Sequence, residues 1–253
     1  MSVSFVRRNA ASVRASARSF YREPLNLALL LALPALSIVL YGVGLGQFSA
    51  VGFLGTGPSL ETTGRITGAV FATGALAGIL GLFQIISARE ADRRLSICGF
   101  PAVDLIVSRF VTLVGISLLI AVVSTATLVV LLSEPIRSPV FVTAGLAIAG
   151  VVYAMLGMLV GAVLPRALEG SLVLVILADM DNVLASGIFA IDESITRFAP
   201  LNYPHAIVTK AVTRGELASG KVLPALTFVA IFGLIAIVAY TRTVGPMLGG
   251  DSE

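Results

Sequence analysis

Two carboxylates and one carboxamide lie in the middle of an apolar stretch, where polar side chains are costly. Asp179, Asp181 and Asn182 belong to the run LADMDN, and Ser186 follows one turn later. An ionised carboxylate at the centre of a bilayer costs roughly 2.5–3.5 kcal/mol on insertion scales. Helical spacing places Asp179, Asn182 and Ser186 on one face and directs Asp181 elsewhere. We expect the carboxylates either to face a hydrated cavity or to be protonated; alternatively, the helix breaks here and leaves them in a wet vestibule.

The other reactive residue types argue against catalysis by this chain. Cys98 is the only cysteine and His205 the only histidine, so neither an intrachain disulfide nor a multi-histidine metal site can form. The sequence contains no P-loop, no nucleophile elbow and no zinc-binding HExxH motif. We therefore expect no catalytic residue, metal ligand or cofactor site. His205 could sense pH, but a packed or interfacial histidine is favoured.

A second group of charges forms an island between two apolar runs. Its charged residues are Arg89, Glu90, Asp92, Arg93 and Arg94. Ser87 and Glu90 have the S-x-x-E spacing of a capping box, whereas Gly99 and Pro101 are typical of a helix end. This pattern predicts a short helix outside the membrane, and the alternative is a solvated positive-inside loop.

Composition determines the fold class that must position these groups. The chain of 253 residues is 57% hydrophobic and 12% charged, with a mean hydropathy of +1.00. A soluble domain of this size could not bury so much apolar surface. We predict an all-α, polytopic integral membrane protein whose membrane domain covers residues 25–243. Its six predicted spans are residues 25–46, 64–86, 106–132, 140–164, 168–191 and 222–240.

The two ends of the chain are predicted to lie outside the spans. In residues 1–24, apolar side chains recur every three or four positions beside a basic face. The arginines of that face are Arg7, Arg14, Arg18 and Arg22. This pattern predicts an amphipathic helix on anionic membrane lipids, with a disordered basic leader as the alternative. Residues 244–253 would form a short tail.

The distribution of Lys and Arg gives an orientation. With six spans, eleven of the 17 basic residues fall on the side of the N-terminus. The positive-inside rule then places both termini in the cytoplasm and the protein in the cell membrane. The net charge of +3 is too small to indicate nucleic-acid binding.

Three stretches occur in an order that resembles the permease subunit of type-2 ABC transporters. They are YREP at Tyr21–Pro24, the charged segment Arg89–Pro101, and APLNYPHAI at Ala199–Ile207, which is similar to the family's P-L-x-x-x-x-A-I signature. SGIF at Ser186–Phe189 also resembles the end of the family's fifth span. The resemblance extends over nearly the whole chain.

The resemblance implies a role for each region. Arg89–Leu95 would be the family's coupling helix, which docks onto a separate ATP-binding subunit that holds ATP and Mg. Its contact residues would be Arg89, Glu90, Asp92, Arg93, Arg94 and Leu95. The basic helix within residues 1–24 would lean on the same subunit. The outer cap of the pathway would include Pro200, Tyr203, Pro204 and His205. The chain itself would not be an enzyme.

The family also implies a dimer with a second permease copy or a paralogue. Members of the family are mostly exporters. The fifth span, with Asp179, Asp181, Asn182 and Ser186, would then approach the pathway or the dimer axis. The two aspartates depart from the family, whose fifth span is usually apolar there. Two other functions stay open: a proton-coupled secondary transporter that uses Asp179 and Asp181, and a non-transporting membrane anchor for a cytoplasmic partner.

Overall fold

A computed structural model describes residues 24–48, 60–97, 102–132, 134–164, 166–188 and 192–244. Within these ranges all regular structure is helical, which confirms the predicted all-α class. The helices are α2 (Pro24–Phe48), α3 (Leu60–Ile97), α4 (Ala102–Leu131), α5 (Pro139–Val163), α6 (Ala167–Ala185), α7 (Glu193–Thr196), α8 (Asn202–Arg214) and α9 (Ser219–Val244). The predicted basic helix falls almost entirely on residues 1–23, outside the described residues, as does most of the predicted tail.

Five helices in the described part of the chain are long and apolar enough to cross a membrane. Their apolar segments are Ala28–Gln47, Leu60–Asp92, Ile106–Leu131, Pro139–Val163 and Ser219–Thr241. These segments support a multi-pass membrane protein. Helix α6, which the sequence also predicts as a span, is not among these five segments, because its 19 residues include Glu169, Asp179 and Asp181.

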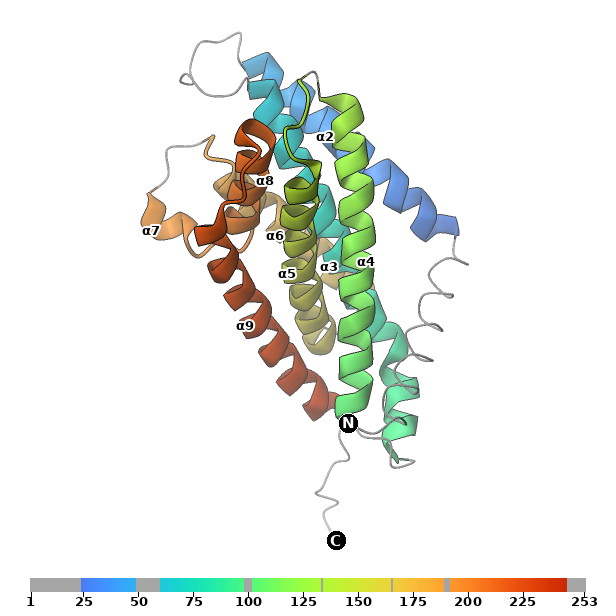
Figure 1. Cartoon of the computed structure of the whole chain (residues 1–253). Helices are drawn as coiled ribbons and strands as arrows, with labels where there is room; N and C mark the ends of the chain where they lie inside the picture. Colours follow the sequence, from blue (N-terminus) through green and yellow to red (C-terminus); the bar gives the residue numbers. More distant parts are fainter. Residues whose placement is uncertain are drawn as a thin grey trace, which may run out of the picture.

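Helices α3 and α5 form the centre of the bundle (Figure 1). Helices α2, α4 and α6 pack against α3, whereas α5 also contacts α4, α8 and α9. The long helices alternate in direction, and α7 and α8 lie together at one end, the upper end in Figure 1. Helices α3 and α9 finish at the opposite, lower end, where α4 begins.

Glycines allow the two central helices to approach closely. A Cβ atom at Gly157 of α5 would overlap the backbone carbonyl of Gly78 in α3, and one at Gly81 would overlap the carbonyl of Ala154. Small residues at a crossing allow two helix backbones to approach in this way. The α3–α5 contact therefore fixes the frame to which the other helices are attached.

The charged island is not a separate helix. Helix α3 continues without a break for 38 residues, from Leu60 to Ile97, so the predicted helix start at Ser87 is wrong. No Gly or Pro occurs between Gly81 and Ile97, and nothing in the sequence interrupts the helix there. The S-x-x-E spacing at Ser87 is thus an internal part of α3.

Candidate functional site

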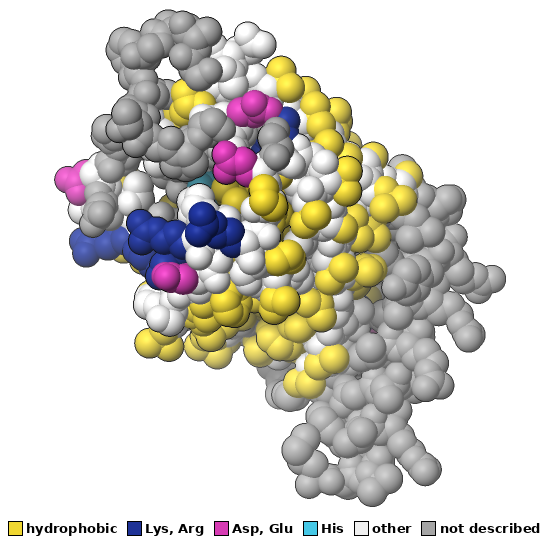
Figure 2. All heavy atoms as spheres, turned by 45° about the horizontal axis from the view of Figure 1, so that its top comes forward, with side chains coloured by type: hydrophobic (Ala, Val, Ile, Leu, Met, Phe, Trp, Pro, Cys, Tyr) yellow, Lys and Arg dark blue, Asp and Glu magenta, His cyan; other side chains and the backbone are white. Residues whose placement is uncertain are grey.

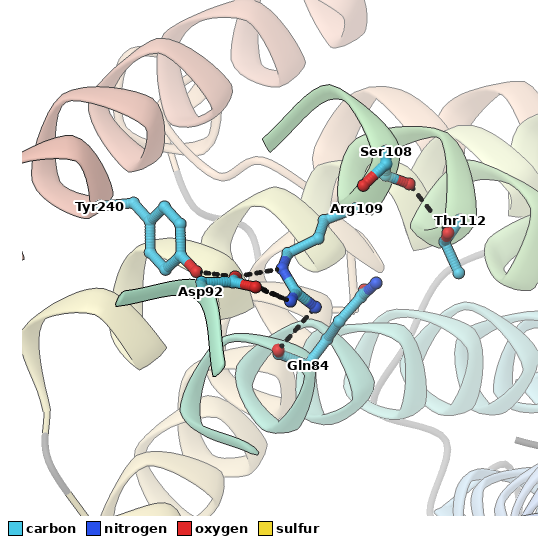
Figure 3. Close-up of polar contacts among 6 residues, drawn as sticks. All are labelled: Gln84, Asp92, Ser108, Arg109, Thr112 and Tyr240. Carbon is cyan, nitrogen blue, oxygen red and sulfur yellow. Dashed lines mark hydrogen bonds and ion pairs between the residues drawn. The ribbon is translucent and has the colours of Figure 1, made fainter. Parts of the chain in front are cut away.

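A buried ion pair closes the lower end of the bundle. Asp92 of α3 is only 2% exposed and accepts two hydrogen bonds from Arg109 of α4, Nε to Oδ2 at 2.9 Å and Nη2 to Oδ1 at 2.7 Å. The Tyr240 hydroxyl of α9 donates to the same carboxylate, and Arg109 Nη1 donates to the carbonyl of Gln84 at 3.2 Å (Figure 3). We call Asp92, Arg109 and Tyr240 the inner clamp. A two-pronged guanidinium–carboxylate contact is strong and geometrically specific, so the clamp joins α3, α4 and α9 firmly.

Arg89 joins the same end of α3 to α5. Its Nη2 donates to the carbonyl oxygen of Gly161 at 2.6 Å and to that of Ala162 at 3.4 Å. Both carbonyls belong to the last turn of α5, where backbone acceptors lack intrahelical donors. A cation in this position also complements the negative end of the helix dipole. Arg89 therefore caps α5 and fixes it to α3.

Beyond the inner clamp, α3 presents an exposed end. The Glu90 and Arg94 side chains pair with each other and are 79% and 75% exposed. Leu95 and Ile97 are also exposed, which leaves apolar and charged groups side by side. Six residues of this segment were expected to contact a partner. The structure instead turns Asp92 inward and uses Arg89 as a cap, whereas Glu90, Arg94 and Leu95 are accessible. The side chain of Arg93, the sixth predicted residue, lies outside the described part of the structure.

A second polar cluster lies in the upper half of the bundle. Asp181 of α6 is 4% exposed, and its Oδ2 accepts hydrogen bonds from the Tyr153 hydroxyl at 2.8 Å and from the backbone N–H of Leu201 at 3.0 Å. Leu201 immediately precedes α8. Among the described residues no donor reaches Oδ1 of Asp181. The carboxyl group thus ties α6 to α5 and to the start of α8.

Asn182 extends this cluster to α3. Its Nδ2 donates to the backbone carbonyl of Thr67 at 2.9 Å. The Thr67 hydroxyl lies 3.2 Å from Nε2 of His205, and the Thr209 hydroxyl lies 3.4 Å from Nδ1. We call Asp181, Asn182, Tyr153, Thr67 and His205 the outer cluster. It joins α3, α5, α6 and α8 through uncharged hydrogen-bond donors.

The two aspartates of α6 occupy different environments. Helix α6 is continuous to Ala185, which rules out the alternative of a helix broken at the aspartates. Asp181 and Asn182 are buried, whereas Asp179 is exposed on the flank of the bundle. There Asp179 accepts a hydrogen bond from the Tyr41 hydroxyl of α2. Ser186 follows the last turn of α6, and its hydroxyl donates to the carbonyl of Val183 at 2.7 Å.

The predicted outer cap corresponds to the turn before α8 and to α8 itself. Pro204 and His205 are buried, and Pro200 is half-buried. The Tyr203 hydroxyl donates to the carbonyl of Arg197 at 3.0 Å, and its ring packs against Phe228 of α9. Burial lowers the pKa of His205 to about 4, so the imidazole is neutral at physiological pH. The favoured prediction of a packed histidine is confirmed.

The surface of the upper end differs from the flanks. Figure 2 shows basic side chains gathered on one side of this end, whereas the flanks are largely apolar. The exposed basic residues near α7, α8 and the start of α9 are Arg197, Arg214 and Lys221, and Arg137 lies on the loop beside Gly215. This distribution is typical of a bundle whose sides face lipid and whose end faces water.

An apolar cavity of about 430 Å³ lies between α4, α5 and α9. Its lining includes Phe110 and Ile237, which are close in sequence to Arg109 and Tyr240 of the inner clamp, and Met155 and Met158 of α5. Every lining residue is apolar, so the cavity suits an apolar group and not a charged one.

Sequence analysis missed the partners of both buried carboxylates. The hydroxyl donors Tyr153 and Tyr240 each lie within long apolar helices, and Arg109 lies four positions into the predicted third span. A polar group so placed needs a buried partner, and this was the available signal. Among the described residues no three His, Cys, Asp or Glu side chains converge in a way that could hold a metal ion.

The helical fold and its five long apolar helices support the class of an α-helical, multi-pass membrane protein. The sequence matches no family model, and no curated protein is significantly similar to it.

Proposed function

We propose that this chain is the transmembrane permease subunit of an ATP-driven transporter of the type-2 ABC class, acting in export. It forms the translocation pathway as a dimer with a second copy or a paralogue, and it binds a separate ATP-binding subunit. In this proposal α6 also crosses the membrane, as the fifth of six spans in chain order, and both termini are on the cytoplasmic side of the cell membrane. The lower end of the bundle is then cytoplasmic.

The observation that supports this proposal best is the exposed end of α3. It combines an accessible Glu90–Arg94 pair with the exposed apolar side chains of Leu95 and Ile97. Apolar anchors with a charged rim are typical of protein–protein contacts, in which the charges set register and association rate. The motif order described above makes an ATP-binding subunit the expected partner.

The contacts at the base of this end would transmit force. A helix of 38 residues is about 57 Å long, so α3 reaches from the partner to the upper end as one rigid element. The inner clamp carries a displacement of α3 to α4 and α9, and Arg89 carries it to α5. ATP can drive such a movement only if the partner binds the two conformations with different free energy.

The test is co-purification of the tagged full chain from its native membranes in mild detergent. We expect a stoichiometric P-loop ATPase. The double variant Glu90→Arg, Arg94→Glu keeps an internal pair but inverts the charges that a partner meets, so it should lose the ATPase.

The matched control is Arg166→Glu with Glu169→Arg, which inverts another exposed pair, at the start of α6. This control should retain the ATPase. Recovery of the chain alone, or equal ATPase binding by both double variants, would contradict the proposal.

A further inference from the structure

Asp181 is a buried acid with an incomplete set of donors. Its Oδ2 accepts from Tyr153 and from the backbone of Leu201, whereas no donor among the described residues reaches its Oδ1. Both donors are uncharged. A carboxylate that is removed from water needs a compensating charge or a full set of hydrogen bonds.

No element packed against α6 supplies a cation to Asp181 in the described part of the chain. On the upper half of α3 the charged residues are Glu61 and Arg65, which pair with each other and lie against α2. From α5 the facing titratable group is Tyr153, a donor to the carboxyl group.

Helix α8 brings His205 to the outer cluster, but only through Thr67 and Asn182, and burial holds the pKa of this imidazole at about 4. Lys210 of α8 pairs with Glu216 at 3.0 Å, and Arg214 is exposed at the end of that helix. Tyr41 of α2 donates to Asp179, the other acid of α6. Each charged or titratable neighbour is therefore neutral, paired elsewhere or in water.

We propose that Asp181 is a proton-binding site, at which one proton from water converts the buried carboxylate to a neutral carboxylic acid. The proton adds to Oδ1, the oxygen without a donor, and Oδ2 stays free to accept from Tyr153 and Leu201. Protonation removes the net charge and keeps the contact that holds the start of α8. Deprotonation returns the proton to water and leaves an uncompensated charge where α5, α6 and α8 meet. This site is independent of any ATPase partner.

The experiment is infrared spectroscopy of the purified full chain in lipid nanodiscs at pH 6. An exposed aspartate has a pKa near 3.9 and is ionised at that pH. We expect a protonated-carboxyl C=O band that is lost in Asp181→Asn and retained in Asp179→Asn. Raising the pH should replace this band with carboxylate bands. This change should be absent in Asp181→Asn and present in Asp179→Asn.

The variant Tyr153→Phe provides a second measurement, because it removes one donor from Oδ2 and keeps Asp181. It should shift the frequency of the same C=O band without abolishing it. Loss of a carboxylate band at pH 6 in Asp181→Asn, or a protonated band insensitive to both Asp181→Asn and Tyr153→Phe, would overturn the proposal.

Discussion

The inner clamp and the outer cluster each bury one aspartate, and they satisfy it by opposite means. Asp92 at the lower end is held by the guanidinium of Arg109 and by Tyr240. Asp181 in the upper half meets only a tyrosine hydroxyl and a backbone N–H. A two-pronged cation compensates the charge of a buried carboxylate and fixes its helices, whereas a buried carboxylate without a cation keeps an uncompensated cost of desolvation. This difference indicates that the inner clamp forms a rigid base at the lower end. In the upper half, the charge of the outer cluster depends on whether Asp181 is protonated, as proposed above.

The largest expected effect comes from removing the cation of the inner clamp. Arg109→Met leaves Asp92 buried and unpaired, which typically costs about 3–5 kcal/mol of folding free energy. The measurement is thermal unfolding of the purified chain in detergent. The double variant Asp92→Leu, Arg109→Met should recover most of the loss, because both charges are then gone. The control is Arg166→Ala, which alters an exposed arginine. If Arg109→Met is as stable as this control, the inner clamp does not stabilise the bundle.

The next effect is a pH dependence of stability that belongs to the outer cluster. Burial lowers the pKa of His205 to about 4 in the folded chain, against about 6.5 when unfolded. The unfolded chain therefore binds the proton first. His205 contributes its full stability above pH 6.5, and this contribution falls by up to ~3 kcal/mol as the pH drops towards 4.

Unfolding measured across this pH range in the chain and in His205→Gln isolates the effect of the imidazole. The variant should lack the acid-side loss that His205 causes. Equal slopes in the two proteins would contradict the buried, neutral histidine.

A smaller effect tests the α3–α5 crossing at the centre of the bundle. Gly157→Ala places a methyl group against the carbonyl of Gly78, so α3 and α5 must separate. Overpacking of this kind typically costs about 1–3 kcal/mol. Gly115→Ala in α4 is the matched control, because a Cβ atom there meets nothing within 4 Å. Comparable melting temperatures for the two variants would mean that the α3–α5 crossing is looser than described.

The smallest effect is expected at Asp181 itself. Asp181→Asn resembles the protonated acid in shape and charge, so stability at pH 6 should change by no more than about 1 kcal/mol. Asp92→Asn makes the same chemical change but leaves Arg109 unpaired, and it should be several-fold more costly. Equal destabilisation by the two substitutions would remove the distinction between the clusters.

The sequence predicts the helical class and the approximate extent of the long helices, because apolar runs and their breaks are local features. The prediction that a separate helix starts at Ser87 is wrong, since a capping pattern has meaning only where a helix begins. The partners of Asp92 and Asp181 could not be predicted, because Arg109, Tyr153 and Tyr240 reach them only through tertiary packing. The same packing decides which charges of the island remain accessible.

Site-specific photocrosslinking in native membranes is the strongest test of the proposed contact between the lower end of α3 and an ATPase. A photoreactive amino acid at Leu95 should crosslink to a P-loop ATPase subunit. The same probe at Leu168, an exposed apolar residue in the first turn of α6, is the control and should not give this product. An ATPase crosslinked from Leu95 alone is the result that we predict. Crosslinks from Leu95 to lipid only, or to an unrelated protein, would contradict it.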